Sequence, residues 1–377
     1  MVDTRDRARI GILIPTLNEA ENIPTLLHEL AQVLKETPHV EKILIVDDES
    51  TDGTPQVAKE TAEKLGLPLE VVVRHGERGL ASAVITGARY LRERGITHVL
   101  VLDADLQHDP KCIPRLVQAL VESNETPHIV IGSRYVEGAK IIRWSWTRKL
   151  ISRISTWIVN TFLLPKNMKI RDPLSGMFLI EVDTLLRFAR PRKGYKILLE
   201  TILNAIESGH IPKIVEVPII FRERLRGKSK LGARTMLDFA KQVLEHFLKQ
   251  HLRKILKFGI VGACGLGVNL AVLYVLTSFF LVDPRIAGAV SIEASTLSNF
   301  ALHDTWTFRN EKVMEKSLIR RLAKFHLAVG ASLVATYVTY LALLLAVPSP
   351  LTAMVIAVLV GTLVRYLLSI KYVWMLY

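Results

Sequence analysis

Acidic side chains follow a short apolar run about a quarter of the way along the chain. The run 99–102 is followed by Asp103, Ala104 and Asp105, and Gln107 comes two residues later. A bounded apolar run of this kind is typical of a buried strand in a mostly parallel sheet, and ligands bind at the carboxyl ends of such strands. Alternate residues of a strand point to opposite faces, but a turn that begins at Ala104 brings the two carboxylates together.

Two convergent carboxylates with an amide oxygen nearby offer a hard, all-oxygen metal site. Such a site suits Mg²⁺ or Mn²⁺ that bridges the phosphates of a nucleotide. The sequence therefore predicts Asp105 and Gln107 as metal ligands, with Asp103 contacting the metal or a ribose. The alternative is that the Asp-Ala-Asp sequence only ends a strand and caps the next helix, because a lone D-x-D is frequent by chance.

Two further polar loops are expected at the same edge of the sheet. Residues 10–14 and 42–47 are strand-like and enclose the helical pattern of 20–36. This is a βαβ unit, whose crossover places both strand ends on one edge. The loops 15–22 and 47–54 follow these strands, and their backbone groups and carboxylates are suited to hold a base and a ribose. The alternative for the second loop is a turn followed by a helix cap.

The composition divides the chain of 377 residues into two domains and a linker. Residues 1–230 have the pattern of an α/β, Rossmann-like nucleotide-binding domain, and 231–257 are expected to form an interfacial helix and a linker. Residues 258–377 are expected to form a four-helix transmembrane domain, because each apolar stretch is near the ~20 residues that cross a bilayer. The four stretches are 258–282, 286–302, 327–347 and 351–370. Polar residues inside these stretches, such as Asn299 and Arg365, either hold helices together or line a polar path.

The formal net charge of +13 indicates a membrane surface rather than a nucleic acid as the partner. The basic residues cluster beside apolar segments, at 140–153, 222–257 and 309–324. Cytoplasmic edges of spanning helices collect Lys and Arg. No nucleic-acid binding is expected, because no helix-turn-helix, zinc-finger or stacking-aromatic pattern accompanies the charge. The sequence thus predicts a multi-pass integral membrane protein whose catalytic domain lies on the cytoplasmic side, and it gives no indication of oligomeric state.

The stretch 141–164 is expected to form a helix that lies in the membrane interface. Its apolar residues recur at Trp146, Leu150, Ile154 and Trp157, with basic residues between them. A helix with an apolar face, a basic margin and Trp at its ends suits the boundary between lipid and water. The alternative is an ordinary core helix of the catalytic domain.

Ordered motifs run through residues 9–235. They are PTLNEAENI, VDDESTDGT, RGLASAVITGA, LDADLQHDP, GSRY, DPLSGMF, GYKILLET and EVPIIFRERLRGKSKLG. In order and spacing they resemble the dolichol-phosphate mannose synthase family of inverting glycosyltransferases with the GT-A fold. The resemblance implies transfer of mannose from GDP-mannose to dolichyl or another polyprenyl phosphate, giving dolichyl β-D-mannosyl phosphate and GDP. The last 120 residues resemble small GtrA-like membrane proteins, chiefly through Asn299-Phe300 and Trp306-Thr307-Phe308.

The resemblance also implies which residues bind the nucleotide-sugar. Around the nucleoside it places Pro15, Leu17, Glu19, Val46, Asp48 and Ala104, beside Asp103 and Asp105. Around the diphosphate it places Arg224 and Lys230, in a glycine-containing cationic loop that is able to fold over phosphates; the alternative is a solvated basic loop near anionic lipid. Leu17 departs from the family, whose members usually have Tyr there, so stacking against the base is not expected of it.

A lipid phosphate as acceptor needs cations and no general base, because it is already ionised at neutral pH. The cations must hold it in line with the sugar carbon. Arg134 and Arg148 are the leading candidates, and together with Asp105 they form the predicted catalytic set; Ser152 and Arg153 are weaker candidates. Direct displacement by the phosphate inverts the sugar carbon.

Three other functions compete with this prediction. A polyprenyl-phosphate glucosyltransferase using UDP-glucose is open, because the metal site contacts phosphates and does not distinguish base or sugar. A processive polysaccharide synthase is disfavoured, because the nearest match to a Q-x-x-R-W signature, at 140–144, lacks the Gln. A flippase or transporter of lipid-linked sugars with a degenerate catalytic domain is disfavoured by the intact metal and diphosphate motifs.

Overall fold

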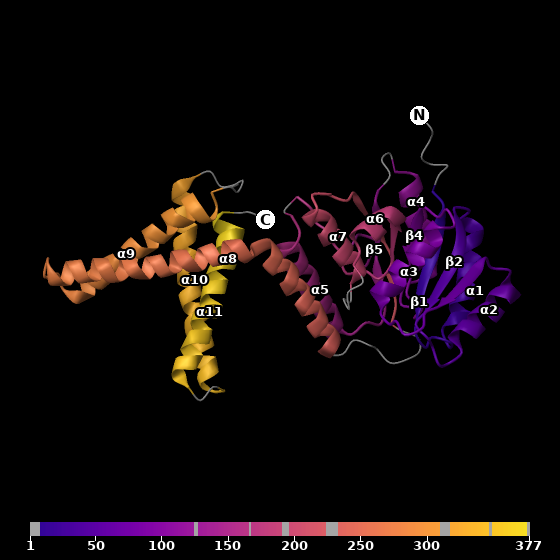
Figure 1. The fold of residues 1–377 in the computed structure, drawn as a ribbon, viewed down its shortest axis with the longest axis horizontal. Helices are drawn as coiled ribbons and strands as arrows, with labels where there is room; N and C mark the ends of the chain where they lie inside the picture. Colours follow the sequence, from indigo (N-terminus) through magenta and orange to yellow (C-terminus); the bar gives the residue numbers. More distant parts are fainter. Residues whose placement is uncertain are drawn as a thin grey trace. The chain divides into compact units, whose positions relative to one another are not determined.

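The computed structural model describes residues 8–123, 127–165, 167–190, 196–223, 233–309, 317–346 and 349–374, without the side chains of 233–236. The chain forms two compact units, Met1–His246 and Phe247–Tyr377. Each unit has its own hydrophobic core. Figure 1 shows the first unit from indigo through magenta to salmon, with helices on a twisted sheet, and the second as helices from orange to yellow.

The first unit is built on a mostly parallel sheet, as expected. In the described chain it has seven strands in the order β3-β2-β1-β4-β7-β5-β8. The strands are β1 (Ile10–Thr16), β2 (Val40–Asp47), β3 (Leu69–Val73), β4 (His98–Val101), β5 (Ile129–Ser133), β7 (Phe178–Glu181) and β8 (Ile214–Pro218). Only β7 runs antiparallel to its neighbours, β4 and β5. Two short strands, β6 (Lys140–Ile141) and β9 (Ile220–Phe221), pair separately.

The strand order reverses between β1 and β4. From β1 the chain moves outward through β2 to β3 and then returns to β4 on the other side of β1. In open α/β sheets such a reversal opens a crevice at the carboxyl ends of the two strands, where ligands bind. Because β7 is antiparallel, the loop 172–177 that precedes it reaches this same edge of the sheet. The fold thus gathers the loops after β1, β2, β4 and β5 and the loop before β7.

Helices cover both faces of the sheet because each buries an apolar stripe. In α1 (Ile23–Val33), the residues Ile23, Leu26, Leu27 and Leu30 are all fully buried. Their spacing of three and four residues is that of one helix face. The other helices of this unit are α2 (Thr54–Leu65), α3 (Leu80–Arg92), α4 (Ile113–Val121), α5 (Trp146–Phe162), α6 (Val182–Phe188) and α7 (Ile197–Glu207), with short helices η2 (Leu34–Glu36) and η3 (Pro110–Cys112).

The helix α5 exposes its apolar stripe. The side chains of Trp146, Leu150, Ile154 and Trp157 are 73, 48, 47 and 54% exposed. A helix of the hydrophobic core would bury these residues, whereas a helix at a lipid surface presents them outward. The exposure therefore favours the interfacial helix over the core helix as the interpretation of 141–164.

The first unit ends inside a long helix, α8 (Ala233–Ser278). A buried polar cluster joins its beginning to α7. The Glu200 carboxylate accepts a hydrogen bond from Gln242 at 2.8 Å and lies 3.0 Å from His246 Nε2. The other nitrogen of His246 lies 2.6 Å from Glu207 Oε1. The predicted domain boundary at residue 230 lies outside the described residues, and the compact unit extends beyond it to His246.

The second unit consists of apolar helices. After α8 come α9 (Pro284–Leu302), η4 (His303–Thr307), α10 (Leu318–Leu344), α11 (Pro350–Leu368) and η5 (Ser369–Val373). Among the described residues, three helical segments are long and apolar enough to cross a membrane: Leu237–Ser278, Leu318–Leu344 and Pro350–Val373. The predicted second span forms the helix α9, which is not one of the three. Most of the predicted interfacial helix of 231–257 and most of the first predicted span, 258–282, form the single helix α8, which ends at Ser278.

Candidate active site

The loops after β1 and β2 are tied together by side chains. The Asn18 backbone N–H donates to Ser50 Oγ at 2.7 Å. The hydroxyls of Thr16 and Ser50 both donate to Asp47, at 2.8 and 2.6 Å. Asn18 and Glu49 have positive φ angles of 56° and 58°, a conformation that needs support from its surroundings. These bonds supply that support, so the two loops form one wall of the crevice.

Several residues that the resemblance implies for nucleoside binding lie along this wall. Pro15 and Val46 are register partners at the ends of β1 and β2. Leu17 is half-buried and Glu19 is buried, with its carboxylate accepting a hydrogen bond from Asn22 at 2.7 Å. The structure therefore brings these four residues to one edge, and their contact with a nucleoside stays a prediction.

Asp48 holds a neighbouring loop in place. Its carboxylate accepts two hydrogen bonds from the Arg74 guanidinium, one of them at 2.9 Å from Nε, and a third at 2.7 Å from the Gly79 N–H. Arg74 also donates to Ser82 at 2.9 Å. Both members of the ion pair are buried, so removing one would leave an uncompensated charge. Asp48 thus fixes the loop between β3 and α3, and its predicted contact with the nucleoside remains to be tested.

The two carboxylates after β4 converge. The chain turns at Ala104 and Asp105, and Leu106 has a positive φ of 59°. As a result, ligand atoms of Asp103, Asp105 and His108 all lie within 4.8 Å of one another. The turn predicted at Ala104 is therefore present. The Gln107 N–H donates to Asp105 Oδ1 at 3.1 Å, and its predicted role as a metal ligand is not tested by this geometry.

His108 is a member of this cluster that the sequence analysis missed. Its ring is buried, and neither nitrogen has a hydrogen-bond partner in the described chain. Nδ1 lies 3.8 Å from Asp103 Oδ2. Burial, with the charges of Arg134 and Lys196, lowers the pKa of His108 to about 3, so the imidazole is neutral. A neutral imidazole with an unpaired nitrogen beside two carboxylates fits a divalent cation. The signal in the sequence that could have indicated His108 as a further metal ligand is its position five residues after Asp103.

Gly176 leaves the space that this cluster needs. A Cβ at this position would lie 2.6 Å from Asp103 Oδ2 and 2.9 Å from His108 Cε1. The loop that carries Gly176 is fixed to β5, because the Ser175 hydroxyl donates a hydrogen bond to the Gly132 carbonyl at 2.6 Å. The loop before β7 therefore packs directly against the metal cluster.

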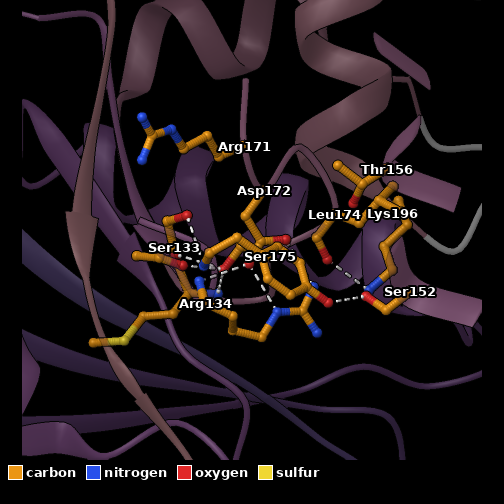
Figure 2. Close-up of polar contacts among 12 residues, drawn as sticks. Ser133, Arg134, Ser152, Thr156, Arg171, Asp172, Leu174, Ser175 and Lys196 are labelled. Carbon is orange, nitrogen blue, oxygen red and sulfur yellow. Dashed lines mark hydrogen bonds and ion pairs between the residues drawn. The ribbon is translucent and has the colours of Figure 1, made fainter. Parts of the chain in front are cut away.

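Arg134, at the end of β5, is held by Asp172 of the same loop (Figure 2). Its backbone N–H and Nε donate to Asp172 Oδ2 at 2.9 and 2.7 Å, and Nη2 donates to Oδ1 at 2.7 Å. The two side chains are 8 and 0% exposed. The rings of Phe221 and Trp144 lie 5.2 and 5.6 Å from the guanidinium. Arg134 is thus fixed at the predicted edge in an ion pair that the sequence analysis did not foresee, and its role towards an acceptor stays a prediction.

The other acceptor candidates lie on α5. The Tyr135 hydroxyl donates to Ser152 Oγ at 2.7 Å, so the structure brings Ser152 beside the end of β5. Arg148 is half-buried and Arg153 is exposed. Figure 2 shows a further residue of this region, Lys196, which the sequence analysis did not single out because no local spacing relates it to the other groups.

The predicted diphosphate residues Arg224 and Lys230 lie outside the described residues. The chain that leads to them is anchored to the metal loop, since the Arg222 N–H donates to the Gln107 carbonyl at 2.7 Å. The Arg222 guanidinium also forms an ion pair with Asp109.

Comparison with known proteins assigns the chain to a protein family. Residues 11–187 match the family model for glycosyl transferase family 2, and 257–374 match that for the GtrA/DPMS transmembrane domain. The protein is thus a membrane-bound glycosyltransferase of the GT-A fold. The dolichol-phosphate mannosyltransferase of Pyrococcus furiosus is 34% identical over 367 residues, which cover 97% of this chain and 99% of that protein. The chain belongs to this family of dolichol-phosphate mannosyltransferases, and the resemblance seen in the motifs is confirmed.

Two further matches concern the catalytic part. The undecaprenyl-phosphate mannosyltransferase of Micrococcus luteus is 34% identical over 227 residues, 59% of this chain and 88% of that protein. The crystal structure of glucosyl-3-phosphoglycerate synthase from Mycobacterium tuberculosis covers 66% of this chain and 80% of its own, with 19% identity and a TM-score of 0.48.

Proposed function

We propose that this protein transfers mannose from GDP-mannose to dolichyl phosphate, or to another polyprenyl phosphate, with inversion. The products are dolichyl β-D-mannosyl phosphate and GDP. The observation that carries the proposal is the match to a dolichol-phosphate mannosyltransferase along 99% of that protein, in both the catalytic and the membrane parts. The catalytic unit is proposed to face the cytoplasm, because basic residues precede the first apolar stretch and cytoplasmic flanks of spanning helices are enriched in Lys and Arg.

The donor site is proposed to be the crevice between β1 and β4. Mg²⁺ or Mn²⁺ held by Asp103 and Asp105, with Gln107 or His108, would supply positive charge to the diphosphate leaving group. The wall formed by the loops after β1 and β2 would hold the nucleoside. Arg224 and Lys230 are proposed to bind the diphosphate as well, because a cationic loop with a glycine is able to close over phosphates and exclude water.

The acceptor is proposed to arrive along α5. The exposed stripe of this helix is suited to the lipid surface, and Arg148, Ser152 and Arg153 lie on the same helix. Arg134 lies at the end of the adjacent strand, fixed by Asp172. A guanidinium binds a phosphate in an oriented, bidentate manner, so these arginines would aim the phosphate at the sugar carbon. The phosphate is already ionised, and no base is required.

The test is a donor panel with the purified full-length protein. GDP-mannose, UDP-glucose and UDP-mannose are each incubated with a polyprenyl phosphate and Mn²⁺ or Mg²⁺, and the anomeric configuration of the lipid product is determined by NMR. We expect transfer from GDP-mannose with a β-linked product. Transfer from the uridine donors alone would contradict the proposed donor, and an α-linked product would contradict inversion.

A variant pair tests the site in the same assay. Asp105→Ala should lower transfer about 10²-fold or more, the scale of losing one key electrostatic partner. Asp183→Ala is the matched control, because this carboxylate on α6 is mostly exposed and lies outside the site. Near-normal transfer by Asp105→Ala, or full activity in excess chelator, would remove the metal assignment.

A further inference from the structure

A lysine that the sequence analysis did not single out belongs to the same polar cluster as Arg134 and Asp172 (Figure 2). Lys196 directly precedes α7, and its Nζ donates to the Leu174 carbonyl oxygen at 2.9 Å. Burial and the Arg134 guanidinium lower the pKa of Lys196 to about 8, against the opposing effect of Asp103 and Asp172. Lys196 is therefore close enough to Asp103 and to the Arg134–Asp172 pair to interact electrostatically with both.

A buried hydroxyl of α5 in this region lacks a hydrogen-bond partner within the described part of the chain. Ser152 and Thr156 are four residues apart and so share one face of the helix. Ser152 accepts the hydrogen bond from Tyr135, whereas Thr156 Oγ1 is buried without a hydrogen-bond partner among the residues that the structure describes. Figure 2 shows Ser152, Thr156 and Lys196 at the same end of the polar cluster. A buried hydroxyl that lacks a partner is costly, and an oxygen of a bound ligand would satisfy it.

From this arrangement we infer that Lys196 and Thr156 bind the phosphate of the acceptor lipid. Lys196 forms an ion pair with one phosphate oxygen, and the Thr156 hydroxyl donates to another. The inference rests on the proposed function, since it takes a polyprenyl phosphate as the acceptor. It adds two residues from different elements, α5 and the start of α7, to the arginines predicted from the sequence.

The position of Lys196 suits the bond changes of the reaction. An acceptor phosphate oxygen forms a bond to C1 of the sugar while the bond from C1 to the GDP oxygen breaks. The electron pair of the broken bond leaves with GDP, and no proton is transferred. The acceptor phosphate and the diphosphate of the donor are both negatively charged, and they repel each other because both are close to C1. A cation beside Arg134 that also interacts with Asp103 reduces the repulsion between the acceptor phosphate and the donor diphosphate.

A purely structural role makes a different prediction. If Lys196 only holds the Leu174 carbonyl, its loss loosens the loop that also carries Gly176. Because Gly176 packs against Asp103 and His108, donor binding and thermal stability would then fall together with transfer. A role in acceptor binding instead affects the acceptor and spares the donor.

The experiment uses the full-length protein with polyprenyl phosphate and GDP-mannose. The variants are Lys196→Met, Lys196→Arg and Thr156→Val. The controls are Lys59→Met, an exposed lysine of α2, and Thr147→Val, an exposed threonine of α5. Steady-state kinetics give kcat and KM for the acceptor, calorimetry gives the Kd of GDP with Mn²⁺, and thermal denaturation gives Tm.

We expect Lys196→Met to lower kcat/KM for the acceptor about tenfold or more while the Kd of GDP changes less than about threefold. Lys196→Arg should recover most of the activity, and Thr156→Val should raise the acceptor KM severalfold. The controls should resemble the wild type. Normal acceptor kinetics in both Lys196→Met and Thr156→Val, or a parallel loss of GDP affinity, would overturn the inference.

The wild-type protein separates this inference from the proposed function. If it transfers a sugar other than mannose to the polyprenyl phosphate, the proposed donor is wrong, and the variants are measured with that sugar. If it transfers mannose and the variants behave normally, only the inference is wrong. If it transfers no sugar to a polyprenyl phosphate, both are wrong.

Discussion

A single methyl group at Gly176 should disable the metal cluster without altering the fold. In Gly176→Ala the new Cβ would lie 2.6 Å from Asp103 Oδ2, at least 0.8 Å short of the 3.4 Å at which ordinary contact begins. It would also lie 2.9 Å from the His108 ring, which is buried and has little room to move. The carboxylate of Asp103 is the more mobile partner, so it should move by most of an ångström.

The size of the effect follows from that displacement. A misplacement of about 1 Å at a reacting site costs about 10²-fold in rate, so transfer should fall by about one to two orders of magnitude. The change should also weaken the dependence on metal, because Asp103 and Asp105 no longer converge. Tm should fall by only a few degrees, since the site lies at the edge of the sheet and outside its core.

The assay is transfer from GDP-mannose across a range of Mn²⁺ concentrations, with thermal denaturation in parallel. Gly267→Ala serves as the control, because a Cβ there meets nothing within 4 Å. If Gly176→Ala keeps the wild-type rate and metal dependence, then Asp103 does not need the position seen here, and the proposed metal site is wrong.

Three other predictions concern the ion pairs and the interfacial helix. Arg148→Lys should lower the rate of transfer at least tenfold, which corresponds to a loss of about 1.4 kcal/mol in transition-state stabilisation. The affinity for GDP, measured by calorimetry, should stay within a few-fold of the wild type. A parallel loss of GDP affinity would place Arg148 in the donor site instead. Asp172→Asn should lower the stability of the first unit by about 3 kcal/mol or more, because it leaves the buried Arg134 charge unpaired; an unchanged Tm would contradict this. Burial raises the pKa of Glu200, but hydrogen bonds from His246 and Gln242 outweigh it and lower the pKa from 4.5 to about 2. The ionised carboxylate therefore stabilises the folded first unit fully above about pH 4.5, and this stabilisation is lost as the pH falls towards 2. In Glu200→Gln, Tm should lose this acid dependence, and an unchanged pH profile would count against the cluster.

The grouping of polar loops at the carboxyl edge of the sheet could be predicted from the sequence, because it depends on local patterns. The apolar run before Asp103 identified a buried strand, and the turn at Ala104 was enough to predict that Asp103 and Asp105 converge. The loops after β1 and β2 followed from one βαβ unit. Each of these conclusions depends on residues close together in the chain, where periodicity and turn chemistry are informative.

The rest of the site depends on contacts between distant segments. The antiparallel insertion of β7 between β4 and β5 brings Asp172 to Arg134, and no local pattern indicates that pairing. Lys196 reaches the same region from the start of α7 for the same reason. His108 was within reach of sequence reasoning, but its significance comes from complete burial without a hydrogen-bond partner in the described chain, which only the folded structure reveals.

The cluster that joins α7 to the beginning of α8 has a consequence for biosynthesis. The ribosome produces α7 before it produces Gln242 and His246, so for a time the Glu200 carboxylate has a place in the fold but lacks these two partners. The partners of the buried Glu200 carboxylate thus belong to the same helix as the first apolar span. The catalytic unit is therefore complete only in a chain that has been synthesised as far as the helix that continues into the first apolar span.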